Sequence, residues 1–284
     1  MNIVITGSSG FIGRRLVKLL SNYKKYKLLC ITRSGLNKLN KKNIKYLKCN
    51  LNKINNHKKK IINFNPDILI HLAWDKIPNF NKTNSKKNEM LSKNLINFFS
   101  LNTLIKKVIV SGSCFEIKPP NNKYTYFIKA KKNVLKFLIK ISKKNNFNYY
   151  WLRFFYVYGP GQRSKSIIPH LLSSIKKGEY AEIKEPNARH DFIYVDDICE
   201  SIILACKSNK KSEILEIGTG KVISIKTIVK IIEKISKKKI ITNNHINKKK
   251  NPILKAYIKK TKKEFDWLSK TSIENGLKKT LNYL

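Results

Sequence analysis

The sequence has 284 residues and a formal net charge of +43, from 60 basic and 17 acidic side chains. This length suffices for one large domain or for a domain with an added lobe. No run of about 18 apolar residues offers a membrane span, and the N-terminus shows no export signal. Five dispersed cysteines without a Cys-x-x-Cys pair indicate reduced thiols, so we expect a cytoplasmic protein without a metal site.

The positive charge comes almost entirely from lysine, since only six of the basic residues are Arg. Arg is the better residue for recognising phosphates and bases. The lysines run through every segment beside abundant Asn and Ile, which is typical of the codon usage of an AT-rich genome. We therefore expect no specific nucleic-acid partner. A nucleic-acid-associated basic protein stays an alternative, and polyanion affinity that falls steeply with salt would identify it.

The N-terminal segment 6–13 is a glycine-rich turn between an apolar run and the amphipathic run Phe11–Leu20. A strand, a turn and a helix N-terminus in this order form an anion site, because backbone N–H groups and the helix dipole point at a pyrophosphate. Gly7 permits the turn, Gly10 lets phosphate approach, and Gly13 lets the helix pack on the strand. A glycine turn without a ligand is the alternative, but this context favours a dinucleotide cofactor.

A second apolar run, Lys27–Thr32, ends at Arg33. In dinucleotide-binding folds the end of this strand meets the adenosine ribose. An acidic residue there would bond the 2′-hydroxyl of NAD, whereas Arg suits the 2′-phosphate of NADP. Because no Asp or Glu lies near Arg33 in the sequence, NADP is modestly favoured over NAD. A solvated loop arginine explains the residue equally well.

Strands and helices alternate through the first half of the chain. The predicted strands are Ile3–Ile5, Lys27–Thr32, Ile44–Lys48, Ile68–Ala73, Val108–Ser111 and Tyr149–Phe154. The predicted helices are Phe11–Leu20, a stretch ending at Phe64, Asn88–Leu104 after the polar stretch 76–87, and Tyr126–Ser142. Near-continuous apolar strands in this alternation predict a doubly wound parallel α/β sheet of the Rossmann type.

Beyond residue 159 the pattern becomes irregular, which predicts a smaller mixed C-terminal substrate lobe. The predicted elements are helices at Ile167–Lys176 and Ser224–Lys237, strands at Ala181–Ile183 and Asp191–Tyr194, and exposed loops within the lysine-rich tract Lys237–Lys263. The chain is expected to return to the sheet around 196–205 and 214–218. We therefore divide the chain into a dinucleotide-binding domain, 1–158 completed by about 191–220, and a mostly substrate-binding lobe, 159–284.

Six motifs occur in order along the chain. They are Thr6-Gly7-x-x-Gly10-Phe11-Ile12-Gly13, His71-Leu72-Ala73, Ser111-Gly112-Ser113-Cys114-Phe115-Glu116, Arg153-x-x-x-Val157-Tyr158-Gly159-Pro160-Gly161, Asp191-Phe192-Ile193-Tyr194-Val195-Asp196-Asp197 and Ile217-Gly218-x-Gly220. Together they resemble the extended short-chain dehydrogenase/reductases of the NAD-dependent epimerase/dehydratase family. The resemblance implies hydride transfer at C4 of a nucleotide-linked sugar, by a 4-epimerase or a 4-keto reductase. It also implies a homodimer formed through the two long helices, about 88–104 and 126–142.

The resemblance implies that the cofactor lies along the glycine turn and the ends of the first strands. The implied cofactor-binding residues are Gly7, Ser9, Gly10, Phe11, Ile12, Gly13, Arg33, Asn50, Leu51, Leu72, Ala73 and Lys131. Small Ala73 leaves room for the cofactor, and His71 is expected to be a core histidine. Asn50 stands where relatives usually carry an Asp that accepts a bond from the adenine amino group, and its amide oxygen can also accept.

The catalytic pair is where the sequence departs from the family. The family uses Tyr-x-x-x-Lys, in which the phenol passes a proton and the Lys holds the nicotinamide ribose and lowers the pKa of the phenol. Lys131 matches this Lys, but Phe127 stands four residues before it and carries no exchangeable proton. Tyr126 and Tyr124 are candidate replacements, and Ser113 matches the family residue that hydrogen-bonds the reacting oxygen.

Three interpretations remain open at this stage. A neighbouring Tyr, Ser113 or water takes over the proton step; the protein binds cofactor and sugar without turnover; or the alignment of the helix is shifted. We expect an NAD(P)-dependent enzyme, because Ser113, Lys131 and the glycine turn all persist. The alternative is a catalytically silent protein that binds cofactor and nucleotide sugar.

The resemblance also implies a set of substrate contacts. They are Glu116, Tyr156, Arg163, Arg189 and His190. Tyr156 stands where relatives often carry an Asn that contacts the sugar diphosphate, and His190 where an Arg usually grips phosphate. Glu116 has the alternative of a solvated loop acid. Ser113 is not followed by the Asp-Glu pair of the 4,6-dehydratases, so dehydration is not expected. The sugar and the nucleotide are not determined, because fold alone does not specify chemistry.

Overall fold

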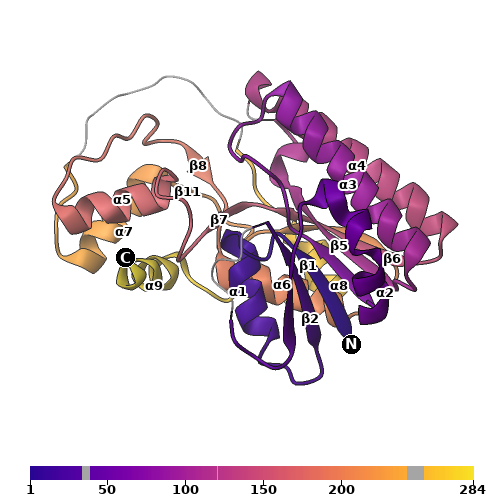
Figure 1. The fold of residues 1–284 in the computed structure, drawn as a ribbon. Helices are drawn as coiled ribbons and strands as arrows, with labels where there is room; N and C mark the ends of the chain where they lie inside the picture. Colours follow the sequence, from indigo (N-terminus) through magenta and orange to yellow (C-terminus); the bar gives the residue numbers. More distant parts are fainter. Residues whose placement is uncertain (34–38, 120, 242–252) are drawn as a thin grey trace. The chain divides into compact units, whose positions relative to one another are not determined.

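The computed structural model describes residues 1–33, 39–119, 121–241 and 253–284. The chain divides into two compact units (Figure 1). The first unit comprises residues 1–153 and 199–215, and the second comprises residues 154–198 and 216–284.

A sheet of seven strands, counted over the described residues, forms the centre of the first unit in the order β10-β6-β5-β4-β1-β2-β3. The strands are β1 Asn2–Thr6, β2 Lys27–Thr32, β3 Ile44–Lys48, β4 Ile68–His71, β5 Lys107–Ser113, β6 Asn148–Phe154 and β10 Glu213–Ile217. β1 pairs in parallel with both β2 and β4, and the parallel ladder continues to β3 and to β5. The strand order reverses between β1 and β4, where ligands bind in such sheets. The predicted Rossmann-type fold is confirmed.

Helices cover this sheet. They are α1 Phe11–Leu20, α2 Lys58–Phe64, α3 Lys82–Asn102, α4 Thr125–Lys144 and α6 Val195–Lys207, with short 3-10 turns η1 Leu51–His57, η2 Cys114–Glu116 and η3 Asn122–Tyr124. α3 and α4 run side by side (Figure 1). Val4, Leu69 and Val108 of neighbouring strands join Phe99 of α3 and Val134 of α4 in one buried cluster. This packing holds α4 along the sheet and sets where its first turns lie.

Helix α3 begins at Lys82 rather than at the predicted Asn88. The side chain of Asn81 caps it by accepting a hydrogen bond from the backbone N–H of Asn84 (2.9 Å). The first turns consist of polar residues, so no apolar period marks the start of the helix, although Asn84 and Ser85 are buried. The predicted polar spacer 76–87 was therefore wrong from residue 82 onward, because these residues belong to α3.

The second unit contains short strands and four helices among its described residues. They are β7 Tyr156–Tyr158, β8 Arg189–His190, β9 Phe192–Tyr194, β11 Ile223–Ser224, α5 Ile167–Lys177, α7 Ile225–Ser236, α8 Ile258–Phe265 and α9 Ile273–Tyr283. Buried Asp191 ties the unit together by accepting hydrogen bonds from the backbone N–H groups of Thr219 (2.8 Å), Gly220 (2.9 Å) and Ala256 (3.1 Å). No helix in the described part of the chain is long and apolar enough to cross a membrane.

One prediction for this unit was wrong. Residues 181–183 do not form a strand, although the N–H of Ala181 donates to the carbonyl of Ile241 (2.9 Å). The lysine-rich tract 237–263 carries non-helical residues at 238–241 and 253–257, and α8 begins within it at Ile258. Residues 242–252 of that tract lie outside the described residues.

The glycine turn brings β1 and α1 into direct contact. Gly7 has a φ of +72°, a left-handed conformation that glycine adopts without steric cost. A Cβ on Gly13 would lie only 2.1 Å from the carbonyl oxygen of Gly7, so α1 can pack this closely only without a side chain there. The turn closes with a hydrogen bond from Gly10 N to Gly7 O (3.0 Å).

Replacing Gly13 by Ala is expected to destabilise the protein by about 1–3 kcal/mol, because the helix must move away from the turn. Denaturant unfolding of the variant and the wild type measures this difference. Gly10→Ala is the matched control and should cost less, since its Cβ would lie 3.2 Å from the same oxygen. Equal stability of Gly13→Ala and wild type would contradict the close contact.

Candidate functional site

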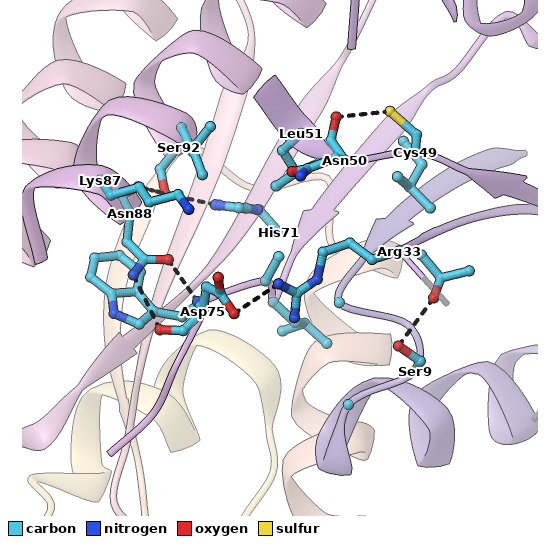
Figure 2. A pocket seen from close by; sticks show the side chains of 18 residues that line it. Ser9, Arg33, Cys49, Asn50, Leu51, His71, Asp75, Lys87, Asn88 and Ser92 are labelled. Carbon is cyan, nitrogen blue, oxygen red and sulfur yellow. Dashed lines mark hydrogen bonds and ion pairs between the residues drawn. The ribbon is translucent and has the colours of Figure 1, made fainter. Parts of the chain in front are cut away.

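A cavity at the carboxyl ends of β1, β2, β3 and β4 gathers most of the predicted cofactor residues (Figure 2). Those that line it are Gly7, Ser9, Gly10, Arg33, Asn50, Leu51, Leu72 and Ala73. Phe11, Ile12 and Gly13 form the start of α1 behind the turn and do not belong to the lining. Lys131 on α4 is likewise outside it.

The turn has the features of an anion site. Gly10 is the N-cap of α1, and the first turn of that helix carries no acidic residue. Ser8 Oγ donates to the carbonyl of Ile31 (3.2 Å), and Thr32 Oγ1 donates to Ser9 Oγ (3.1 Å), so the turn is tied to β2. The N-terminus of α1, with the positive end of its helix dipole, therefore stands beside the cavity with no acidic residue in its own first turn. These residues fit the pyrophosphate of a dinucleotide.

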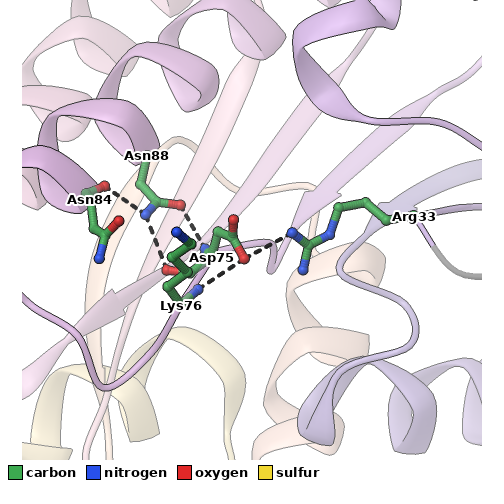
Figure 3. Close-up of polar contacts among 5 residues, drawn as sticks. All are labelled: Arg33, Asp75, Lys76, Asn84 and Asn88. Atoms are coloured by element: carbon green, nitrogen blue, oxygen red, sulfur yellow. Dashed lines mark hydrogen bonds and ion pairs between the residues drawn. The ribbon is translucent and has the colours of Figure 1, made fainter.

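Arg33 does not stand alone at the end of β2. Its guanidinium donates to Asp75 Oδ1 at 2.9 Å, with side-chain exposures of 64% and 22% (Figure 3). The backbone N–H of Asp75 donates to Asn88 Oδ1 (2.6 Å), and Asn88 Nδ2 donates to the carbonyl of Asp75 (3.2 Å). Asn88 Nδ2 also donates to Asn84 O (2.8 Å), which anchors the group to α3.

Lys131 is buried against β5 among aromatic rings. Its ammonium donates to the carbonyl of Ser111 (2.6 Å) and lies 4.0 Å from the ring centroid of Trp74. The ring centroids of Phe127 and Trp151 both lie 5.9 Å away. Burial lowers the pKa of Lys131 to about 8, although the nearby carboxylate of Glu116 acts in the opposite direction. The amine is therefore mostly charged at neutral pH.

Phe127 shares the buried face of α4 with Lys131. Its ring packs edge-on against Trp74 (5.5 Å between centroids) and at a tilt against Phe80 (4.8 Å). Tyr126 is 47% exposed at the surface. Tyr124 packs against Phe80 (5.1 Å) and Phe115 (4.5 Å). The structure thus places a phenyl ring, without a hydroxyl group, one helical turn before Lys131.

Ser113 ends β5 and begins a capping box. Its Oγ accepts a hydrogen bond from Phe115 N (3.2 Å), and its own N–H donates to Glu116 Oε1 (2.7 Å). The carboxylate of Glu116 is fully buried and also accepts bonds from Trp151 Nε1 (2.9 Å) and Arg153 Nε (3.3 Å). Glu116 is therefore not a solvated loop acid, and it links the end of β5 to β6.

His71, the last residue of β4, is buried between two hydroxyl groups. Its Nδ1 lies 2.7 Å from Thr6 Oγ1 and its Nε2 lies 2.9 Å from Ser92 Oγ. Burial, together with the positive charge of Lys131, lowers the pKa of His71 to about 3. The ring is therefore neutral at physiological pH and belongs to the core, as the sequence predicted.

The other predicted substrate residues belong to the second unit. The rings of Tyr156 and His190 stack at 4.0 Å between centroids. Burial lowers the pKa of His190 to about 4, so it offers no positive charge at neutral pH. Arg189 is exposed on β8, and the carbonyl of Arg163 accepts a bond from Ser166 N (3.0 Å) before α5.

Ten of the residues that line the cavity were not among the predicted cofactor residues, and Trp74, Asp75 and Asn88 belong to these ten. The signal for two of them was present, because Trp74 and Asp75 directly follow the strand that ends near Ala73. Residues just beyond the carboxyl ends of parallel strands face the ligand crevice. Asn88 carried no such signal, since it lies inside α3 and reaches the cavity only through the packing of that helix.

The family model for the NAD dependent epimerase/dehydratase family matches residues 3–218. The chain belongs to the NAD dependent epimerase/dehydratase family. The match spans the glycine turn, the end of β5 and the start of α4, the segments in which the cavity and Lys131 lie. The family resemblance inferred from the six motifs is confirmed.

Relatives match this family member over most of its length. An uncharacterized protein of Methanocaldococcus jannaschii is 25% identical and covers 99% of this chain and 95% of its own. The dTDP-6-deoxy-L-talose 4-dehydrogenase (NAD(+)) of Aggregatibacter actinomycetemcomitans is 29% identical over 81% of this chain and 88% of its own. The fold is similar to that of UDP-glucuronic acid 4-epimerase from Bacillus cereus, with a TM-score of 0.86, 21% identity and coverage of 100% and 98%.

Glu116→Gln is expected to lower the free energy of unfolding by about 2–3 kcal/mol, because it removes a buried charge that accepts three hydrogen bonds. Denaturant unfolding followed by tryptophan fluorescence measures this, since Trp151 is one of the donors. Glu179→Gln is the control: Glu179 is 62% exposed and pairs with Lys177 at 3.7 Å, so its loss should cost less than about 1 kcal/mol. Equal effects of both variants would contradict a special role for Glu116.

Proposed function

We propose that the protein is an NAD-dependent redox enzyme that acts at C4 of a nucleotide-linked sugar, as a 4-epimerase or a 4-keto reductase. The observation that supports it best is the cavity of the first unit, where the glycine turn and the ends of three further strands converge. Membership of the family adds support, as do relatives whose names state a 4-dehydrogenase and a 4-epimerase of nucleotide-linked sugars.

Within this proposal the glycine turn and the residues Asn50, Leu51, Leu72 and Ala73 hold the dinucleotide. The nicotinamide, when bound, supplies or accepts the hydride. The ammonium of Lys131 holds the ribose hydroxyls, and the hydroxyl of Ser113, at the end of β5, orients the sugar oxygen. Glu116 keeps Ser113 in place through its bond to the backbone N–H, so we assign it a positioning role.

The substrate is assigned to the second part of the chain. We propose that residues 1–158, completed by about 191–220, bind the cofactor and that residues 159–284 mostly bind the substrate. The stacked pair Tyr156 and His190 offers a flat, uncharged surface. Arg163 and Arg189 then carry the positive charge for a diphosphate.

The proposal includes NAD as the first choice of cofactor. The sequence favoured NADP through Arg33, but the guanidinium of Arg33 is engaged by Asp75. Solved structures of similar fold contain NAD, which is consistent with this choice.

We further propose a cytoplasmic homodimer formed through α3 and α4. All five cysteines are free and buried, as in a reducing compartment, and Met90 and Leu101 of α3 are more than half exposed.

One observation favours a second function, a silent protein that binds cofactor and nucleotide sugar. The ring of Phe127 is buried against Trp74 and Phe80 at the position of the family's phenol. The proton step then depends on Ser113, on water, or on Tyr124 or Tyr126. Tyr126 is nearly half exposed, and Tyr124 packs within an aromatic group. A measured turnover number separates the two functions.

Phe127→Tyr is expected to raise turnover by about a hundredfold or more, because it restores a general acid and base beside Lys131. The measurement follows NADH oxidation with a panel of nucleotide-linked 4-keto sugars, beside NAD binding by calorimetry. Tyr126→Phe and Tyr124→Phe are the controls and should change nothing in a silent protein. If the wild type already has a high turnover number and one of the two Tyr→Phe variants abolishes turnover, the tyrosine replaced in that variant has taken over the role of the family's phenol.

Affinity for NAD is expected to fall by about tenfold as the pH rises from 7 to 9.5. The pKa of Lys131 is lowered to about 8, so its ammonium form predominates at pH 7 and is lost progressively as the pH rises through that value. Calorimetry across this range gives the profile. Lys131→Met should bind NAD weakly and independently of pH, and a wild type with constant affinity would exclude this role for the ammonium.

A further inference from the structure

The ion pair between Arg33 and Asp75 (Figure 3) joins two residues that line the cofactor cavity. Arg33 follows β2 and Asp75 follows β4, and the strand order is β4-β1-β2. The pair therefore bridges two strands that stand about 10 Å apart, on either side of β1. Between these two strands lies β1, and the glycine turn begins at Gly7, directly after it. Both residues line the cavity together with Gly7, Ser9 and Gly10.

Asp75 is the immobile partner of the pair. Its backbone is held on both sides by the buried side chain of Asn88, which accepts from its N–H and donates to its carbonyl. Its carboxylate also accepts a bond from the N–H of Lys76 (2.9 Å). Arg33 has a long side chain that is 64% exposed, so the guanidinium reaches across to a carboxylate whose position is set by α3.

This arrangement changes what Arg33 offers to a dinucleotide. A 2′-phosphate needs a cation at the end of β2 with free donors, as in folds that prefer NADP. Here the guanidinium is drawn toward β4 and its charge is balanced by Asp75. A 2′-phosphate would have to displace that carboxylate or lie close to it, and two anions repel each other. The 2′-hydroxyl of NAD carries no charge and meets no such barrier.

We propose that Asp75 makes this protein select NAD over NADP, by holding Arg33 away from the 2′-position of the adenosine ribose. The inference rests on the proposed function, because it requires a dinucleotide in the cavity. It assigns cofactor selectivity to a residue that follows β4 instead of to the end of β2, where the choice is usually made.

The test is the affinity of purified protein for NAD and for NADP, measured by calorimetry at low and moderate salt. Asp75→Asn keeps an oxygen for the N–H of Lys76 but removes the charge, so Arg33 becomes available to the phosphate. The ratio of the dissociation constants for NADP and NAD is expected to fall by about tenfold or more. The gain should shrink as salt rises, since the freed Arg33 is solvent-exposed.

Three further variants complete the design. Arg33→Gln alone should alter NADP affinity by less than about threefold. The double variant Arg33→Gln with Asp75→Asn should lose the gain in NADP affinity that Asp75→Asn alone produces. The departure of the double variant from the sum of the two single effects measures the coupling between the residues. Asp67→Asn is the matched control, because it breaks the ion pair of Asp67 with Lys106 (3.0 Å), also in the first unit. That control should leave the ratio unchanged.

The outcomes separate this inference from the function on which it rests. If wild type and Asp75→Asn bind both dinucleotides with the same ratio, the selectivity role of Asp75 is overturned and the proposed cofactor site stands. A wild type that prefers NADP also overturns the role. If the wild type binds neither dinucleotide, the proposed function fails and this inference fails with it.

Discussion

The close contact between α1 and β1 is the constraint on which the cofactor cavity depends. Helix α1 lies where a side chain on Gly13 would collide with the carbonyl of Gly7. This contact puts the positive end of the helix directly behind the turn, at the point where the strand order reverses. Because Ser8 and Ser9 also bond to β2, the ends of β1 and β2 form one continuous wall.

The chemistry of the site depends on a buried cation among aromatic rings. The faces of Trp74, Phe127 and Trp151 surround the ammonium of Lys131, and one backbone carbonyl accepts a bond from it. Aromatic faces stabilise a positive charge, but they exchange no proton. The site therefore keeps a group that can hold hydroxyls and lacks the usual route for a proton. For this reason one geometry supports both an enzyme and a silent binding protein.

Structural features were predicted best where the residues that cause them all lie in one short segment of the sequence. The glycine turn, the strands beside it and the phenyl ring at residue 127 are of this kind. Predictions failed where the cause lies elsewhere in the chain. Residues 181–183 show the alternating burial of a strand, yet they make no ladder among the described residues. The start of α3 was missed because its polar first turns carry no apolar period, although Asn84 and Ser85 are buried there.

The sequence by itself determined the Rossmann-type fold, the family and the missing phenol, because each can be recognised from residue types that lie a few positions apart in the chain. Only the tertiary structure decided what surrounds the charges. Arg33 looked like a free cation in the sequence, and its partner Asp75 follows a different strand. Glu116 was predicted as a substrate contact with a solvated loop acid as the alternative, and packing of β5 against β6 buries it beside Trp151. A charge acts through its neighbours in space, and those neighbours come together only when distant strands pair.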